Sequence, residues 1–353
     1  MRKIYEKGRS NIVANNVMVA TSQPLSSQEA INILRMGGNA VDAAIAASAV
    51  LSVVEPGSTG IGGDCFAIVK MEHNNPVSFN GSGINPKNAD LDYFKKNKID
   101  KIGVLSPHSV TIPGAVDAWY EMHKKFGKLD FEQLFKTAEE YAREGFPVHE
   151  IEAYHWKKNE DKLKKNKITK KEFLINDKAP EFASKYRNIK LANTLKTIGQ
   201  KGAKGFYEGE IARDMVKSLN KLGGTHTEED FYNQYTIIPG LLTNKKNETI
   251  FSYGVMGGQY QPIGQVHVLQ NIFEFGMSIQ EAIDTQRAFA LNGKLKIEKS
   301  FSKSLIKDLS DLGHDIQIAE DAIGGGQAIM IDRKKGVLIG GSDSRKDGLA
   351  IGY

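Results

Sequence analysis

The chain contains one cysteine, Cys65, and this scarcity excludes an internal disulfide. Cys65 begins the apolar segment 65–69, where a cysteine is expected to be buried as a small hydrophobic residue and not to serve as a catalytic thiol. Residues 1–9 carry several charges, and no uninterrupted apolar stretch with a small-residue cleavage site follows them. We therefore expect no secretory leader and a cytoplasmic location.

Long hydrophobic runs and metal-binding clusters are also missing. Residues 40–54 are strongly apolar, but they are too few to cross a bilayer and include Asp42 and two serines, so a buried helix is predicted. The eight histidines form no His-x-x-x-His pattern and no Cys/His cluster. We expect no membrane span, no metal and no cofactor.

The charges are nearly balanced, with 47 basic and 42 acidic residues and a net charge of +5. Much of the excess lies in residues 157–171, which hold eight lysines. Leu163 and Ile168 are the only apolar residues of that run, and it has no aromatic side chain on which a base could stack. The run predicts a solvated helix or loop, and nucleic-acid binding is not expected.

The composition is that of a globular protein, because 353 residues with 40% hydrophobic content can bury one large core or two ordinary ones. Apolar residues at helical spacing predict helices at 114–126, 131–144, 191–198 and 209–222. Residues 327–331 and 337–339 are predicted to form a hairpin around 332–336, and no internal repeat is present.

Two further helices are predicted near the start of the chain. Ser26 and Glu29 have the spacing of a capping box, for a helix that stops at the glycines 37–38. Asn39 and Asp42 repeat this capping spacing at the start of the apolar helix.

A glycine-rich loop, 56–64, joins that apolar helix to a strand predicted at 65–69, which is expected to pair with 77–79. Phosphate-binding glycine loops follow a strand and open a helix, so the opposite order here argues against a nucleotide site. Two interpretations stay open for the loop: a tight connection under a packed sheet, or part of a substrate pocket.

The segment 253–265 combines glycines and a proline with amide side chains. Paired glycines such as Gly257 and Gly258 let the main chain approach a carbonyl oxygen and aim N–H donors at it, as an oxyanion hole requires. The alternative for the pair is a plain turn.

Several segments along the chain together resemble the γ-glutamyltransferase family. Those similar to the large-subunit half are 20–27, 37–44, 54–63, 109–116 and 205–209, and those similar to the small-subunit half are 236–240, 254–265, 275–277, 281–282 and 341–348. The resemblance implies an α+β fold, the αββα sandwich of the N-terminal-nucleophile hydrolases. It implies a large-subunit-like part, 1–235, and the C-terminal part of a small subunit, 236–353, in one composite domain without an independent linker. Gly257 and Gly258 match the oxyanion-loop glycines of the family and are the predicted substrate-binding residues.

The resemblance also implies a mechanism for which this chain has no nucleophile. Family members cleave themselves, and the threonine exposed at the new N-terminus attacks the amide with its own α-amino group as base. That threonine lies between the segment matched here by 223–230 and the segment beginning at Thr236, and only 231–235 separate the two in this chain. The sandwich is therefore expected to be incomplete, and no catalytic residue is predicted.

Two threonines close to this junction are candidates for the missing nucleophile, and both are better explained otherwise. Thr227 and Asp230 have the spacing of a helix cap before Phe231. Thr236 belongs to a strand that leads out of the site in the family.

A second departure concerns the substrate carboxylate, which family members commonly hold with an arginine after the first hairpin. Residues 79–87 contain no arginine, and Lys87 could supply a charge without the bidentate fork. A different acyl group is therefore one possible substrate.

Three functions follow as hypotheses. The chain is a γ-glutamyl transferase or hydrolase of glutathione-like amides, inactive as it stands; a non-catalytic paralogue or remnant that assembles with a full-length relative; or an amidase or acylase of another acyl specificity. No Gly-x-Ser-x-Gly elbow supports a serine triad. The expected partner is a small-molecule γ-glutamyl amide or related acyl amide, and a homo-oligomer is possible.

Overall fold

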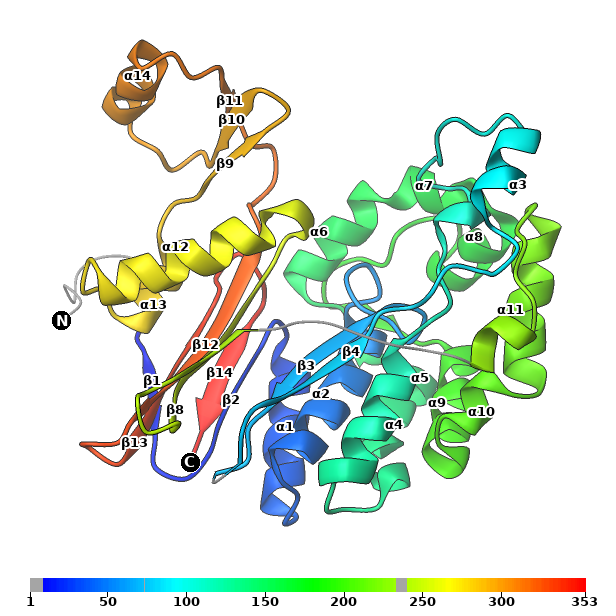
Figure 1. The fold of residues 1–353 in the computed structure, drawn as a ribbon, viewed down its shortest axis with the longest axis horizontal. Helices are drawn as coiled ribbons and strands as arrows, with labels where there is room; N and C mark the ends of the chain where they lie inside the picture. The colour runs from blue at the N-terminus through cyan, green and yellow to red at the C-terminus, as the bar shows by residue number, and fades with distance from the viewer. Residues whose placement is uncertain (1–8, 73, 233–239) are drawn as a thin grey trace. The chain divides into compact units, whose positions relative to one another are not determined.

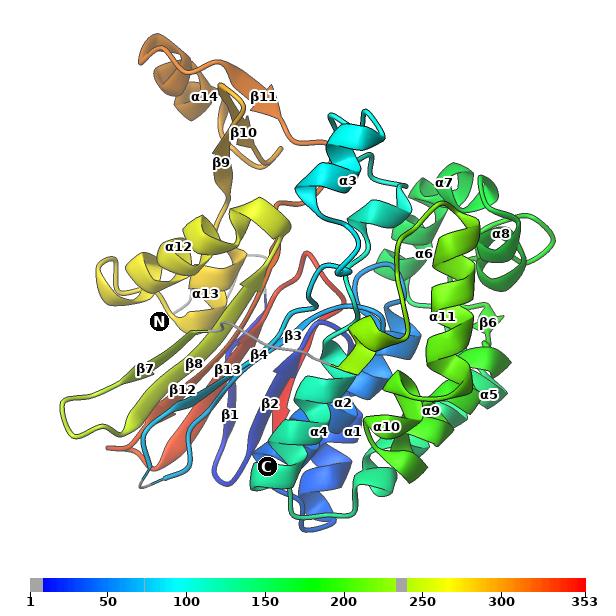
Figure 2. The ribbon, with the colours of Figure 1, turned by 45° about the vertical axis from the view of Figure 1, so that its right-hand side comes forward.

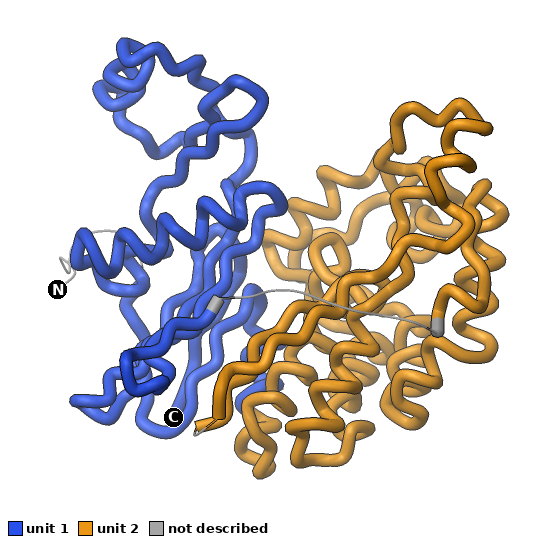
Figure 3. Tube along the Cα trace, viewed as in Figure 1, with its two compact units in different colours: residues 1–31, 240–353 blue, residues 32–239 orange. Residues whose placement is uncertain are grey.

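The computed structural model describes residues 9–72, 74–232 and 240–353 (Figure 1). The chain divides into two compact units, residues 1–31 with 240–353 and residues 32–239 (Figure 3). The predicted boundary between 235 and 236 falls outside the described residues. The units are described separately below as unit 1 and unit 2.

Unit 1 is built on a five-stranded antiparallel sheet in the order β1-β13-β12-β8-β7 (Figure 2). Its strands are β1 (Ile12–Ala14), β7 (Gly240–Thr243), β8 (Thr249–Met256), β12 (Gly325–Asp332) and β13 (Val337–Ser342). The hairpin predicted around 332–336 is confirmed, with Asp332 opposite Val337.

Helices α12 (Gln261–Phe273) and α13 (Ile279–Asp284) cover one face of this sheet. The core between them is apolar and contains Phe251 and Ala328 from the sheet with Val268 and Ile283 from the helices. Burial of these side chains is the main force that holds the helices on the sheet.

Two smaller sheets also belong to the described part of unit 1. Strand β2 (Met18–Thr21) pairs with β14 (Leu349–Gly352). A three-stranded sheet, in the order β11-β10-β9, is accompanied by one helix. Its elements are β9 (Ala288–Leu291), β10 (Lys294–Ile297), α14 (Lys303–Asp311) and β11 (Ile316–Ile318).

The chain enters unit 2 through helix α1 (Pro24–Arg35). The predicted start at Ser26 is wrong, because the helix begins at Pro24 and Ser26 lies inside it. The side chain of Gln23 accepts a hydrogen bond of 2.6 Å from the backbone N–H of Leu25 and takes the role expected of the serine.

The apolar helix of unit 2, α2 (Ala40–Val54), confirms the prediction for 40–54. Asn39 caps it, accepting from the N–H groups of Val41 and Asp42, while the Asp42 carboxylate accepts from the Asn39 N–H in a complete capping box. Asp42 is fully buried and also accepts from the Lys128 N–H, so one carboxylate satisfies two segments of backbone.

The predicted hairpin after the glycine loop is confirmed as β3 (Cys65–Val69) and β4 (Val77–Gly81). Helix α4 (Ala115–Phe126) packs on it so closely that a Cβ on Gly81 would lie 2.5 Å from the Cβ of Ala118.

The other predicted helices of unit 2 are confirmed with small changes. The segment 131–144 is a 3₁₀ turn followed by an α-helix. The remaining elements are α3 (Leu91–Lys96), η1 (Pro107–Ser109), η2 (Phe131–Phe135), α5 (Lys136–Glu144), β5 (Phe146–Pro147), β6 (Lys185–Tyr186), α9 (Ile189–Lys201), α10 (Lys204–Tyr207), α11 (Glu210–Lys221) and η3 (Glu229–Tyr232).

The lysine-rich run forms three short helices, α6 (Glu150–Lys158), α7 (Glu160–Lys164) and α8 (Lys167–Phe173). At their centre, the carboxylate of Glu160 accepts from Lys157 at 2.8 Å, from Lys164 at 2.6 Å and from the Ala179 N–H at 3.0 Å. The lysines of this run thus include two that hold a buried carboxylate. No helix of the described segments is long and apolar enough to cross a membrane.

Candidate functional site

The predicted glycine pair lies in unit 1, where β8 ends and the chain turns into helix α12 through η4 (Gly258–Tyr260). Gly257 has φ +134° and Gly258 has φ +56°, values that side-chain-bearing residues rarely adopt. The turn is closed by a hydrogen bond of 3.1 Å from the Tyr260 N–H to the Gly257 carbonyl. We call residues 256–260 the glycine turn.

The two glycines are required for different reasons. A Cβ on Gly257 would lie 2.9 Å from the Cα of Gly324, so close backbone packing excludes a side chain there. A Cβ on Gly258 would meet nothing within 4 Å. None of the described residues fills the space beside Gly258, so this space is open to a ligand.

The glycine turn leads directly into a 13-residue helix, with Pro262 in its first turn. The first N–H groups of a helix have no partner within the helix and carry the positive end of its dipole. N–H groups at such a strand-to-helix turn can donate to a carbonyl oxygen that gains negative charge during acyl transfer. The predicted role of Gly257 and Gly258 as oxygen-binding residues remains a proposal that this geometry supports.

Tyr260 packs its side chain against the backbone of the glycine turn at Gly257. Its side chain is 1% exposed and its ring meets the ring of Phe289 edge-on, with centroids 5.6 Å apart. A Cβ on Gly264 or Gly324 would collide with the Tyr260 ring, so these two glycines make room for it. Burial raises the pKa of Tyr260, and the phenol stays neutral at physiological pH.

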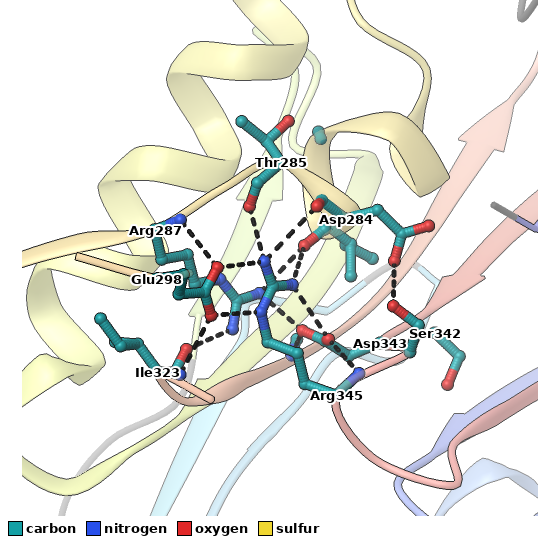
Figure 4. Close-up of polar contacts among 12 residues, drawn as sticks. Asp284, Thr285, Arg287, Glu298, Ile323, Ser342, Asp343 and Arg345 are labelled. Carbon is teal, nitrogen blue, oxygen red and sulfur yellow. Dashed lines mark hydrogen bonds and ion pairs between the residues drawn. The ribbon is translucent and has the colours of Figure 1, made fainter. Parts of the chain in front are cut away.

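Figure 4 shows a set of ion pairs in the interior of unit 1. The set lies next to the glycine turn, because the Arg287 guanidinium carbon is 5.8 Å from the centroid of the Tyr260 ring. Arg345 donates to both oxygens of Glu298, at 2.6 and 2.7 Å. Arg287 donates to Asp343 at 2.5 Å, and Asp343 also accepts from Arg345 at 3.2 Å. We call Arg287, Glu298, Asp343 and Arg345 the ion-pair network.

The ion-pair network fixes the backbone that supports the glycine turn. Glu298 accepts from the Ile323 N–H at 3.1 Å, and Arg287 donates to the Ile323 carbonyl at 2.7 Å. Asp343 accepts from the Gly326 N–H at 2.6 Å. Both ends of 323–326 are thus held, and Gly324 between them is the residue against which Gly257 packs.

Charge and burial compete in this network. Burial acts to raise the pKa of Glu298, but the Arg345 guanidinium outweighs it, so the pKa of Glu298 lies below its usual value. Burial and the charges of Arg287 and Arg345 together lower the pKa of His267 on α12. Of the network, only Asp343 and Arg345 lie in a segment singled out from the sequence, 341–348, which resembles the family. No local sequence pattern marks Arg287 and Glu298 as partners of that segment.

In unit 2 the glycine loop 56–64 borders a cavity of about 590 Å³, whose other walls include Ser48, Cys65 and Trp119. The Gly63 carbonyl accepts from the N–H groups of Gly114 and Ala115, each at 3.0 Å, and this fixes the loop at the start of α4. The loop is therefore both a packed connection and a cavity wall. Burial raises the pKa of the Cys65 thiol to about 11, so it is protonated at neutral pH, as expected for a structural cysteine.

The other residues singled out from the sequence have structural partners or no described place. Asp230 accepts from both the N–H and the hydroxyl of Thr227 at 2.8 Å, so the carboxylate half of the predicted cap is present before η3, whereas the hydroxyl donates to Asp230 instead of accepting from a backbone N–H. Thr236 lies outside the described residues. Lys87 has an exposed side chain, and its N–H donates to Asp230 at 2.9 Å. Among the residues that the structure describes, no three His, Cys, Asp or Glu side chains could hold a metal ion together.

Comparison with known families gives two adjoining matches to the γ-glutamyltranspeptidase profile, over residues 26–237 and 233–353. The chain belongs to the γ-glutamyltranspeptidase family. The two matches meet at 233–237, the region where the sequence places the junction between large-subunit-like and small-subunit-like segments.

Individual relatives agree with this assignment. The chain is 32% identical over 326 residues to the glutathione hydrolase-like YwrD proenzyme of Bacillus subtilis, covering 85% of this chain and 61% of that one. It is 34% identical over 252 residues to glutathione hydrolase 2 of Arabidopsis thaliana, covering 71% of this chain and 42% of that one. The chain thus spans about half the length of these relatives.

Among solved structures, a cephalosporin acylase from Bacillus halodurans matches with a TM-score of 0.92 and 24% identity, covering 100% of this chain and 98% of that one. At this identity the likeness shows the fold. The predicted α+β class of the N-terminal-nucleophile hydrolases is confirmed.

Proposed function

We propose that this chain carries the acyl-oxygen-binding turn of a γ-glutamyl-amide transferase or hydrolase but no nucleophile, so that it binds the amide without turning it over. The observation that carries the proposal is the glycine turn: two residues with positive φ at a strand-to-helix junction, one of them open to a ligand. Family membership supplies the substrate class, a glutathione-like amide.

The proposed lack of turnover follows from the junction in the sequence. Acyl transfer through an N-terminal threonine needs the hydroxyl, its own amine and the oxygen-binding amides in one place. Only five residues, 231–235, separate the two family segments that flank the nucleophile-bearing stretch. Restoring that stretch between Tyr235 and Thr236 should supply the missing threonine hydroxyl and its amine. The restored chain should then turn over glutathione-like amides, as an enzyme of glutathione metabolism does.

A second candidate is hydrolysis of an amide with a different acyl group. It is favoured by residues 79–87, which offer no arginine for a glutamyl carboxylate, and by the exposed position of the Lys87 side chain. The fold is also that of a protein described as a cephalosporin acylase. A third candidate is a non-catalytic paralogue or remnant, which would act by assembling with a full-length relative or with another copy of itself. For all three candidates the proposed location is the cytoplasm.

The test combines mass spectrometry with an activity assay. Purified protein should keep a single intact mass and release no chromophore from a γ-glutamyl anilide. Two fragments together with anilide turnover would refute the proposed lack of catalysis. A chain with the restored central segment is the positive control, and the same chain with the new nucleophilic threonine changed to alanine is the negative one.

The restored chain also separates the candidates. Preference for γ-glutamyl over glutaryl and oxamate-type amides supports the first, and the reverse preference supports the second. If the restored chain self-cleaves but none of these three amides is a substrate, the γ-glutamyl assignment fails. Comigration of the original chain with a full-length relative in size-exclusion chromatography would support the third.

A further inference from the structure

Lys346 is half-buried and makes no ion pair with the described residues. In the sequence it directly follows Arg345, a member of the ion-pair network. Its neighbour Arg345 is fully engaged by Glu298 and Asp343. The Lys346 N–H donates to the Asp343 carbonyl at 3.3 Å, so the network also fixes the point from which the lysine side chain starts.

The Lys346 side chain lies across strand β12 at Gly325. A Cβ on Gly325 would lie 2.9 Å from Lys346 Cγ and 3.4 Å from its Cε, and 3.3 Å from Met256 Cγ. Gly325 pairs with Met256 in the sheet, and Met256 is followed by Gly257 and Gly258. The absence of a side chain at Gly325 thus lets the lysine stem reach the strand end that leads into the glycine turn.

The two faces of β12 carry different parts of this arrangement. A Cβ on Gly326 would face Arg287, Asp343 and Ile283, on the side covered by α13. Since successive residues of a strand point to opposite faces, Lys346 over Gly325 lies on the other side of the sheet. The cation is therefore separated by the strand from the carboxylates of the network.

A second polar group without a partner lies on the same face. Gln327, two residues from Gly325, has both its Oε1 and its Nε2 buried with no hydrogen-bond partner among the described residues. Buried polar atoms normally have partners, and an unpaired ammonium in a half-buried place favours an anion. A carboxylate accepts hydrogen bonds from both an ammonium and an amide N–H.

We propose that Lys346 binds the carboxylate of an acyl group whose carbonyl oxygen lies at the glycine turn, with Gln327, two residues along β12 from Gly325 and on the same face, as a second donor. This makes Lys346 a specificity residue for acyl groups that end in a carboxylate, in place of an arginine in 79–87. The proposal rests on the proposed function of the glycine turn, but binding of a carboxylate needs no nucleophile and can be measured on the present chain.

The experiment is a titration of the purified chain with glutarate, followed by NMR of the Gly258 and Gly325 backbone amides and the Gln327 side-chain amide. Glutarate should shift all three signals, and glutaramide, its neutral analogue, should bind at least about tenfold more weakly because a charge-assisted hydrogen bond is lost. Added salt should weaken glutarate binding, since the interaction is between charges.

Lys346→Gln should weaken glutarate binding by about tenfold or more and remove its salt dependence, whereas Lys346→Arg should retain most of it. Lys335→Gln, on the exposed β12–β13 turn, is the matched control and should bind as the unmodified chain does. Far-UV circular dichroism confirms that each variant is folded. Equal binding of glutarate and glutaramide, or unchanged binding by Lys346→Gln, would overturn the proposal. A restored chain without turnover would count against the proposed function alone.

Discussion

The guanidinium of Arg287 and the carboxylate of Asp343 lie 2.5 Å apart, and their side chains are only 2% and 0% exposed. Asp343 belongs to the segment after β13, while Arg287 lies just before β9, 56 residues earlier. The pair joins these two segments of unit 1. Because Asp343 also accepts a hydrogen bond from the Gly326 N–H, the pair holds β12 in place where Gly326 pairs with Val255, next to the glycine turn.

Asp343→Ala should strongly destabilise unit 1. The substitution leaves a buried guanidinium without its counter-ion and the Gly326 N–H without its acceptor, and breaking a buried pair costs about 3–5 kcal/mol. Urea unfolding followed by fluorescence measures the change. Lys294→Ala is the control, because the Lys294–Asp315 pair is largely exposed and should contribute less than about 1 kcal/mol. Equal effects of the two substitutions would show that the buried pair has no special role.

Glu160 should make the stability of the chain depend on acid pH. The Ala179 N–H, Lys157 and Lys164 lower the pKa of this carboxyl from 4.5 to about 2 in the folded protein. A depressed folded pKa stabilises the fold fully above about pH 4.5, and that contribution is lost as the pH falls toward 2.

The measurement is the urea midpoint of the chain and of Glu160→Gln across this range. The difference between the two should be constant above pH 5 and should shrink toward pH 2. Glu121→Gln, at an exposed pair with Lys124, should give a small difference that does not change in the same way. Parallel curves for the chain and Glu160→Gln would contradict the assigned role of the carboxylate.

Gly258→Val tests the oxygen-binding role in a chain with the central segment restored. A valine at φ +56° would displace the turn, and the loss of an oxyanion donor costs about 3 kcal/mol of transition-state stabilisation, or about a hundredfold in turnover. Gly336→Val is the matched control, since Gly336 has φ +67° and equally open surroundings in the β12–β13 turn. Comparable turnover in both variants would reduce the glycine pair to a structural turn.

The chain should be only marginally stable as a monomer. In the described residues, β3 and β4 pair only with each other, and β2 pairs only with β14, so these short sheets keep open hydrogen-bonding edges. Analytical ultracentrifugation should show self-association or aggregation that the restored chain lacks. Cooperative unfolding of a monomer at high temperature would contradict this expectation.

The sequence by itself determined the elements with strong local signals. The apolar helix 40–54 has its cap at Asn39, and the hairpins after residues 64 and 324 follow from alternating apolar residues around turns. The positive φ of Gly257 and Gly258 was also predictable, because the paired glycines mark a turn that few other residues tolerate. Where local signals compete, the observed helix boundary differs from the predicted one. The helix that Ser26 was expected to start begins at Pro24, and Gln23 caps it.

Only the tertiary structure decided what surrounds the glycine turn. The partners of each ion pair are far apart in sequence, 56 residues for Arg287 with Asp343 and 47 for Arg345 with Glu298, and a buried ion pair leaves no periodic pattern in a chain. The position of Lys346 depends on Gly325 opposite it and on Arg345 being held by other residues. The pairing of β8 with β12 then places Gly325 opposite Met256, 69 positions earlier in the sequence, and so brings this cluster to the end of β8 that leads into the glycine turn.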